Sequence, residues 1–306
     1  MADERADALS PDTRAVRRAF ARAAATYDGA AVLQKEIGAR MAERLDVVRL
    51  APGAILDAGC GTGDALPELA ARYPKARRVA LDLAQPMLER ARARSREGSS
   101  ALRRLLAPLT GHAGALPAFV CGDLTALPFP AAAFDLVWSN ATLQWIDELP
   151  RALRECHRVL ATGGLFTFTT FGPDTLKELR AAFAGVDAHP HVGRFVDMHD
   201  IGDLLAGSGF ADPVMQMEYM TLTYPDALAM LRDLKAIGAT NAARGRARGL
   251  MGRGRWQRAL SALDAARSGP QGRIAATFEV IYGHAWKAAP TRTAEGHAIV
   301  RFGRRS

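Results

Sequence analysis

The residues with the clearest chemistry are three aspartates and a glycine-rich turn, each at the end of a short apolar run. The segment Asp57–Gly63 (DAGCGTG) has glycine at every second position, so its backbone can approach a ligand with no Cβ in between. Asp82 ends the next apolar run, 25 residues after Asp57, where a carboxylate can accept hydrogen bonds from both hydroxyls of a ribose. Asp123 ends a third run, where it can accept from an adenine amino group. These spacings predict a site for an adenosine-containing cofactor.

The glycine turn differs from the dinucleotide fingerprint G-x-G-x-x-G, because Asp57 leads it and no pyrophosphate has to be held. The sequence therefore predicts S-adenosylmethionine, which becomes S-adenosylhomocysteine when its methyl group is transferred. One strand-terminal aspartate alone is typical of a helix cap, but three after successive strands favour cofactor binding. We expect Met87 and Leu124 to pack on the adenine. The expected cofactor-binding residues are Asp57, Gly59, Cys60, Gly61, Asp82, Leu83, Met87, Asp123, Leu124 and Asn140.

Strands that alternate with helices must position these residues. We expect strands at 54–58, 78–83, 118–122, 134–139 and 165–170, with helices at 64–72, 86–96 and 149–160. This alternation predicts an α/β fold with a doubly wound, mostly parallel, Rossmann-like sheet. The turn, the two later aspartates and Asn140 then lie at the carboxyl ends of strands, where an open α/β sheet binds its ligand.

The remaining segments are expected to complete a single domain over residues 13–288. Residues 1–12 are expected to be disordered, and two amphipathic helices, broken near Tyr27, begin a helical lid over 13–50. The core that binds the cofactor covers 51–172 and carries an insertion at 97–117. After the fifth strand we expect acceptor-side helices at 174–183, 198–208 and 225–237, a loop at 244–258, a closing strand at 277–288 and a tail at 289–306.

The composition is that of an ordinary globule, with 49% hydrophobic and 24% charged residues. No signal peptide is expected, because residues 1–22 are polar and charged, and no apolar run reaches the roughly 20 residues of a membrane span. Three cysteines without a C-x-x-C pair fit a reduced cytoplasm. His189 and His191 lack a third ligand nearby, so no metal site is expected.

The positive charge is concentrated near the C-terminus. The formal net charge is +8, and residues 240–306 hold thirteen Lys and Arg against three acids. One interpretation is compositional bias, because only five of the 40 basic residues are lysine. The other is a basic face for an acidic partner. Nucleic acid is disfavoured as that partner, because Trp256 is the only aromatic residue near the arginines of 244–255.

Residues 55–171 resemble a class I S-adenosylmethionine-dependent methyltransferase of the ubiquinone/menaquinone-methylase-like group. The resemblance rests on ILDAGCGTG, VALDLAQPML, the segment from CGDLTALPFP to VLATGG, and FTFTTFG. The flanking segments resemble the malonyl-[acyl-carrier protein] O-methyltransferases of biotin synthesis from about Arg17 to Lys287. These segments are RRAFARAAATYD, SNATLQW, FTTFGPDTLKELR, VDAHPHVGRF and LRDLKAIGATNAARGR.

This resemblance implies methyl esterification of the free carboxylate of a malonyl thioester on its carrier protein, so that fatty-acid elongation enzymes process it toward pimelate. A carboxylate has a pKa near 4 and needs no general base, which agrees with the absence of a Ser-His-Asp arrangement. Arg194 is expected to anchor the malonyl carboxylate or the ester end, and Tyr27 to cap the cofactor as a lid. Gln144 and Trp145 are expected to form a wall of the acceptor pocket.

Each of these roles has an alternative that the sequence leaves open. Arg194 is otherwise a surface arginine, Tyr27 one more apolar contact between helices, and Trp145 a buried indole that needs a partner for its N–H. The acidic carrier protein is expected to meet the C-terminal basic region, at Arg244, Arg246, Arg248, Arg253 and Arg255.

Alternatives also remain at the level of function. Coenzyme A is the other possible handle for the malonyl group. A related group of respiratory complex I assembly factors shares the core, and some of its members hydroxylate a protein arginine. A third alternative is a binding or assembly protein with this fold and no catalysis, against which the intact turn and the three acids argue.

Overall fold

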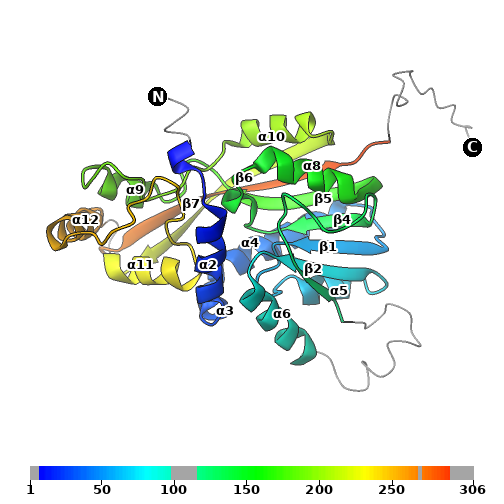
Figure 1. The fold of residues 1–306 in the computed structure, drawn as a ribbon, viewed down its shortest axis with the longest axis horizontal. Coiled ribbons are helices and arrows are strands. Elements are labelled where there is room, and N and C mark those ends of the chain that lie inside the picture. The colour runs from blue at the N-terminus through cyan, green and yellow to red at the C-terminus, as the bar shows by residue number, and fades with distance from the viewer. Residues whose placement is uncertain (1–6, 98–115, 268–270, 290–306) are drawn as a thin grey trace, which may run out of the picture.

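A seven-stranded sheet organises the molecule (Figure 1). The structure is a computed structural model that describes residues 7–97, 116–267 and 271–289. Its strand order is β3-β2-β1-β4-β5-β7-β6. The strands are β1 (Ala54–Ala58), β2 (Arg77–Asp82), β3 (Ala118–Cys121), β4 (Phe134–Ser139), β5 (Leu160–Phe171), β6 (Ala211–Tyr224) and β7 (Ile274–Trp286).

The first five strands are parallel, and β7 and β6 complete the sheet in antiparallel order. In the register, Asp57 of β1 lies between Ala80 of β2 and Trp138 of β4. The turns after β1, β2 and β4 therefore meet at one edge of the sheet. The expectation of a doubly wound, mostly parallel sheet is confirmed.

Helices cover both faces of this sheet. In β1 the side chain of Ile55 packs in one apolar cluster, with α4 and α5, while Leu56 packs in another, with α8 and α10. This alternation follows from the two-residue period of a strand that is buried on both faces. The helices are α2 (Thr13–Ala23), α3 (Tyr27–Ala30), α4 (Val32–Glu43), α5 (Leu66–Arg72), α6 (Gln85–Glu97), α8 (Leu149–Val159), α9 (Lys177–Ala184), α10 (Met198–Gly207), α11 (Ala227–Ala236) and α12 (Arg253–Ala265).

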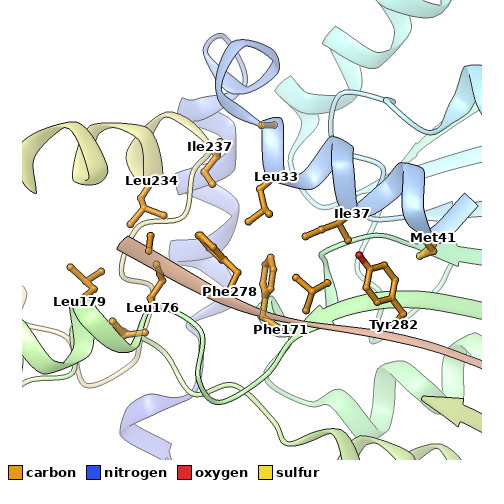
Figure 2. Packing of buried hydrophobic residues seen from close by; sticks show 14 of the residues in the cluster. Leu33, Ile37, Met41, Phe171, Leu176, Leu179, Leu234, Ile237, Phe278 and Tyr282 are labelled. Carbon is orange, nitrogen blue, oxygen red and sulfur yellow. The ribbon is translucent and has the colours of Figure 1, made fainter. Parts of the chain in front are cut away.

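The N-terminal helices are anchored to the sheet through α4. Figure 2 shows Leu33, Ile37 and Met41 of α4 in one cluster with Phe171 of β5 and Phe278 of β7. These three α4 side chains are at most 3% exposed, and they recur every four residues, so they occupy one helix face. The expected break in this helical segment is confirmed, because α3 and α4 follow α2 as separate helices.

Three segments differ from the sequence-based expectation. β6 was not predicted at all, and β5 begins at Leu160 rather than at residue 165. The expected loop at 244–258 is wrong in its second half, because α12 begins at Arg253 and buries Ala259 and Leu263. Burial of that apolar pair supports a helix despite Gly252 and Gly254 at its start.

Residues 7–12 are placed against the rest of the chain, although we expected the segment 1–12 to be disordered. Pro11 forms an isolated β-bridge with Ala243, and the backbone N–H of Asp12 donates to the carbonyl of Ala242 at 2.8 Å. The expected insertion at 97–117 and tail at 289–306 fall almost wholly outside the described residues. None of the helices in the described part of the chain combines the length and apolar character that crossing a bilayer requires.

Candidate cofactor and acceptor site

A cavity of about 260 Å³ lies at the carboxyl ends of the parallel strands. The turns after β1, β2, β3 and β4 supply one side of its wall, and α2 and α3 supply another. Of the residues expected to bind the cofactor, this cavity is lined by Gly59, Gly61, Asp82, Leu83, Asp123, Leu124 and Asn140. Tyr27, expected to cap the cofactor, and Trp145, expected in the wall of the acceptor pocket, also line it.

The glycine turn is shaped by conformations that other residues rarely adopt. Gly59 has φ 82° and Gly61 has φ 52°, both in the left-handed region. A Cβ on Gly59 would collide with the side chain of Thr142. A Cβ on Gly61 would meet only the ring of Tyr27, at 4.0 Å, because the turn is open to the cavity there. The turn thus exposes backbone to the cavity, and Tyr27 lies over it.

The carboxylate of Asp82 is held in place at the cavity wall. Its Oδ2 accepts from the N–H of Gly61 at 2.9 Å, and its Oδ1 accepts from the N–H of Ala84 at 2.8 Å. Burial raises the pKa of Asp82 to about 6, and these two hydrogen bonds act in the opposite direction. Each oxygen keeps a lone pair for a further donor. Two adjacent hydroxyls, as on a ribose, match this arrangement.

Asp57 lies beneath the turn and is 3% exposed. Its Oδ2 has no hydrogen-bond partner among the described residues. Burial, together with the charges of Asp82 and Asp64, raises the pKa of Asp57 to about 8. Asp57 is not among the residues that line the cavity, but an orphaned carboxylate oxygen just beneath the turn suits a cationic donor such as an α-ammonium group. S-adenosylmethionine carries that group, so the residues present fit the cofactor.

The raised pKa of Asp57 predicts an unusual pH dependence of stability without ligand. Between pH 4 and pH 8 the unfolded chain releases this proton while the folded chain keeps it, so stability falls as pH rises. We compare the unfolding free energies of ligand-free Asp57→Asn and wild type. The difference in favour of the variant should be larger at pH 8 than at pH 4 by about 1 kcal/mol or more. Urea unfolding of both proteins at the two pH values measures this. The same difference in unfolding free energy between the two proteins at pH 4 and at pH 8 would contradict the raised pKa of Asp57.

Only one of the two carboxylate oxygens of Asp123 is available to a ligand. Its Oδ1 accepts from the N–H and the Oγ1 of Thr125, both at 2.8 Å, which is the turn-capping use of a strand-terminal aspartate. Its other carboxylate oxygen has no partner among the described residues. The side chain can therefore cap its turn and still accept a hydrogen bond from the cavity.

Three expected contacts lie elsewhere or are already satisfied. Met87 does not line the cavity: it is 1% exposed and packs with Ala24 under α2. Cys60 packs with Leu88, and burial raises the pKa of its thiol far above the usual range. Asn140 lines the cavity, but its side chain donates to the Gln34 carbonyl at 2.9 Å and accepts from Thr169 at 2.6 Å.

A second cavity of about 100 Å³ adjoins the first. The two share Phe20, Tyr27, Ala141 and Trp145 as lining residues. Phe20 and Trp145 meet edge to face, with ring centroids 5.3 Å apart. Phe20 was not expected at the site. The sequence places Phe20 on the apolar face of α2, and that position is equally typical of a core residue.

Arg194 lines this second cavity. Its backbone N–H donates to the carbonyl of Leu9 at 3.4 Å, while its guanidinium has no hydrogen-bond or ion-pair partner among the described residues. Gln144 lines the same cavity and is fixed at both ends of its amide. Its Nε2 donates to the Ala141 carbonyl at 2.6 Å, and its Oε1 accepts from Thr170 at 3.3 Å.

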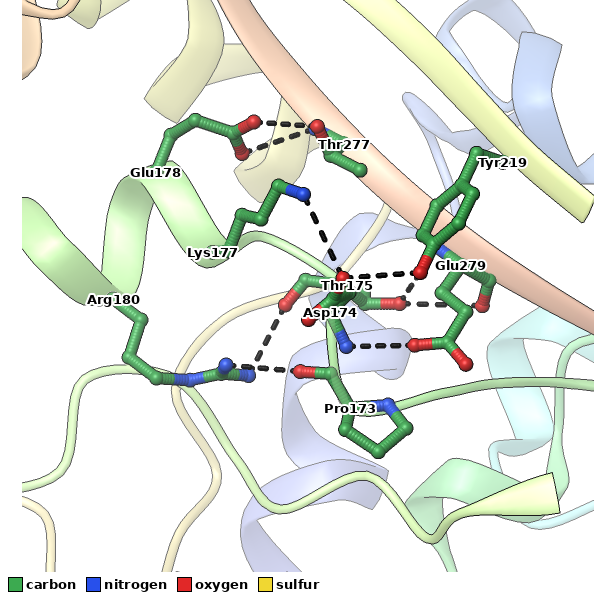
Figure 3. Close-up of polar contacts among 9 residues, drawn as sticks. All are labelled: Pro173, Asp174, Thr175, Lys177, Glu178, Arg180, Tyr219, Thr277 and Glu279. Carbon is green, nitrogen blue, oxygen red and sulfur yellow. Dashed lines mark hydrogen bonds and ion pairs between the residues drawn. The ribbon is translucent and has the colours of Figure 1, made fainter. Parts of the chain in front are cut away.

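A polar network holds the segment that forms the far wall of the second cavity (Figure 3). Buried Glu279 of β7 accepts from the N–H of Asp174 at 2.8 Å, and its own N–H donates to Thr175 Oγ1 at 3.1 Å. Thr175 and Leu176 line the cavity, and Leu176 adopts φ 55°. The network therefore fixes a strained turn against the acceptor-side space.

The two histidines before Arg194 have local partners. His191 Nε2 lies 2.9 Å from Asp187 Oδ1, and its ring stacks on Phe183. His189 Nδ1 lies 3.1 Å from the Gly245 carbonyl. The described residues contain no group of three or more His, Cys, Asp and Glu side chains that could hold a metal ion.

The expected basic region is partly committed to internal contacts. Arg244 pairs with Asp7 at 2.8 Å and also with Asp147. Arg246 pairs with Asp12 at 3.1 Å. These pairs tie the loop after α11 to the start of the chain, so the two guanidiniums are not free for a partner.

The doubly wound sheet, the glycine turn and the acids at the strand ends define a class I methyltransferase. Residues 56–168 match a family described as a methyltransferase domain. Two curated relatives cover nearly the whole chain. A malonyl-[acyl-carrier protein] O-methyltransferase of Gallionella capsiferriformans is 50% identical, over 95% of this chain and 96% of its own. The enzyme of the same name from Laribacter hongkongensis is 51% identical, over 97% of each.

The chain belongs to the family of malonyl-[acyl-carrier protein] O-methyltransferases. It is an S-adenosylmethionine-dependent methyltransferase, and S-adenosylmethionine is its cofactor. Solved structures agree on the fold. A putative methyltransferase from Bacillus halodurans has a TM-score of 0.57 at 16% identity, over 82% of this chain and 100% of its own. The YcgJ protein from Bacillus subtilis has a TM-score of 0.56 at 16% identity, over 82% and 98%.

Proposed function

We propose that this enzyme transfers a methyl group to the free carboxylate of malonyl-[acyl-carrier protein] and so forms its methyl ester for biotin synthesis. The observation that carries the proposal is the pair of adjoining cavities. The first holds the acids that suit an adenosine, and the second holds the unpaired Arg194. The names of the close relatives support the same substrate.

The reaction requires little acid–base catalysis by the protein. The bound cofactor supplies an electrophilic methyl group on a sulfonium. A malonyl carboxylate is ionised at neutral pH, so one of its oxygens can form the new C–O bond while the C–S bond breaks, with no proton transferred. The protein must orient the carboxylate and exclude water, and positioning of this kind lowers a barrier by roughly 7–11 kcal/mol.

The residues where the cavities meet are suited to these tasks. Phe20, Tyr27 and Trp145 present aromatic surface that can displace water from the path between them. We assign Arg194 to bind and orient the malonyl carboxylate through its fork of donors. Gln144, fixed by its two hydrogen bonds, forms the wall beside it.

Tyr27 and its neighbours are suited to serve as a lid, as the helical segment 13–50 was expected to do. The ring of Tyr27 lies over Gly61, and the carboxylate of Asp28 accepts from Thr62 Oγ1 at 2.5 Å. Both contacts join α3 to the glycine turn. Closure of this segment over the cofactor would exclude solvent during transfer.

A basic surface is the proposed means of attracting the carrier protein. Of the C-terminal arginines, Arg248 and Arg253 are exposed and have no ion-pair partner among the described residues. Arg255 lies 3.9 Å from Asp187. We therefore restrict the expected role of this region to these three residues. The proposed location is the cytoplasm, where malonyl-carrier protein is made and where Cys60, Cys121 and Cys156 can remain free thiols.

Growth of a biotin auxotroph tests this function in a cell. A strain that lacks its own malonyl-carrier methyltransferase should grow without biotin when it expresses the wild-type chain. Expression of Asp82→Ala at the same level should not restore growth. Failure of the wild-type chain, with soluble protein that binds S-adenosylmethionine, would favour the assembly-factor or non-catalytic alternatives.

A further inference from the structure

Helix α2 carries four arginines on one surface. Arg14, Arg17, Arg18 and Arg22 follow i, i+3, i+4, i+8 spacing, which places them along one side of a helix. All four are exposed. Among the described residues, none of their guanidiniums has a hydrogen-bond or ion-pair partner. We call this set the α2 arginine face.

The opposite side of α2 faces the site. Val16 and Ala19 are each 5% exposed, and Thr13, Val16 and Phe20 line the first cavity. Phe20 also lines the second cavity. A helix with its side chains is about 10–12 Å across, so the α2 arginine face lies about one helix diameter from the junction of the two cavities. In Figure 1, α2 lies between the parallel strands β1, β2 and β4 on one side and helices α11 and α12 on the other.

The positive charge of this face is not balanced locally. No acidic residue lies in the first turn of α2. The nearby Asp7 and Asp12 are already paired with Arg244 and Arg246. Like charges three and four residues apart destabilise a helix. A surface that keeps four of them in a row beside the active site is suited to an anionic partner.

We propose that the α2 arginine face, and not the C-terminal arginines Arg248, Arg253 and Arg255 that help to attract the partner, is the docking surface for the acidic carrier protein that brings the malonyl group. This inference rests on the proposed function. Acyl carrier proteins are strongly acidic, and their acyl group hangs on a flexible arm, so docking beside the junction lets the malonyl end reach Arg194. Complementary charge also speeds the encounter. Nucleic acid fits less well, because the exposed side of α2 has no aromatic residue to stack on a base.

A charge-reversal triple tests the surface. The variant is R14E/R17E/R18E, and the matched control is R90E/R96E/R154E, which changes net charge equally. The control arginines are exposed on α6 and α8, away from both cavities. We expect KM for malonyl-carrier protein to rise about 10-fold or more in the α2 variant and less than about twofold in the control. With malonyl-pantetheine, which has no carrier, kcat/KM should stay within about twofold in both.

The dissociation constant for S-adenosylmethionine checks that α2 remains folded, because α2 lines the cofactor cavity. If the triple reversal loses that affinity, the neutral variant R14Q/R17Q/R18Q replaces it, with the same direction of change expected. Unchanged KM for malonyl-carrier protein, or an equal rise in the control, would overturn the docking surface. The assay of the wild-type protein distinguishes failure of the docking surface from failure of the proposed function. If the wild type forms no methyl ester on malonyl-carrier protein, the proposed function itself is wrong.

Discussion

Asp82→Ala will weaken binding of S-adenosylmethionine by about 100-fold, which corresponds to about 3 kcal/mol. The carboxylate of Asp82 is fixed by the N–H groups of Gly61 and Ala84, so its remaining lone pairs point in defined directions. Two hydrogen bonds from ribose hydroxyls to a charged acceptor are lost together in the variant. Isothermal titration calorimetry with S-adenosylmethionine and S-adenosylhomocysteine measures the loss.

Asp64→Ala is the matched control for this experiment. Asp64 also follows the glycine turn, but its side chain is 41% exposed and pairs with Arg94 at 2.8 Å. Removal of that charge should change cofactor affinity by less than about threefold. Similar losses in both variants would mean that general negative charge, and not the fixed acceptor pair of Asp82, holds the cofactor.

Arg194→Ala will lower kcat/KM for malonyl-carrier protein by about 100-fold while the affinity for S-adenosylmethionine stays within about twofold. Arg194 is exposed and lines the second cavity, its guanidinium has no partner among the described residues, and the residue is absent from the lining of the first cavity. Its loss therefore removes a contact with the acceptor only. Steady-state methyl transfer, combined with calorimetry for the cofactor, gives both quantities.

Arg194→Lys distinguishes orientation from charge. Lysine keeps the positive charge but lacks the planar fork of donors, so kcat/KM should recover only in part. Full recovery would mean that Arg194 supplies charge alone. Unchanged ester formation in Arg194→Ala would show that another group binds the carboxylate.

The central part of the fold could be predicted from the sequence because its signals are local. β1 and β4 are short apolar runs with the bounds expected for them, since strands buried on both faces leave little choice of residue. The positions of Asp82 and Asp123 follow directly, because Asp82 ends β2 and Asp123 lies two residues after the end of β3. The cofactor could be inferred from these residues alone.

The later strands and helices depend on contacts that one sequence does not display. β6 is the edge strand, and most of its side chains are exposed, so its mixture of Met, Glu, Gln and Thr lacks the apolar run of a buried strand. α12 begins among glycines and arginines, and only the burial of Ala259 and Leu263 reveals its helical period.

The roles expected for the acceptor-side residues stay predictions, but the structure shows how these residues are placed. Tyr27, Gln144, Trp145 and Arg194 do come together around the second cavity. Phe20 was missed because its spacing on α2 is equally that of a core residue. The pairing of Arg244 and Arg246 with N-terminal aspartates was also missed, since it joins segments more than 230 residues apart. Charge in a sequence does not show which charges neutralise one another.

Transfer of a labelled methyl group from S-adenosylmethionine to purified malonyl-carrier protein tests the account most directly. Acetyl-carrier protein, which has no free carboxylate, is the control. We predict label on malonyl-carrier protein alone, released as methanol by mild base as expected of a methyl ester. Label on both carriers, or none on malonyl-carrier protein from an enzyme that binds the cofactor, would contradict the account.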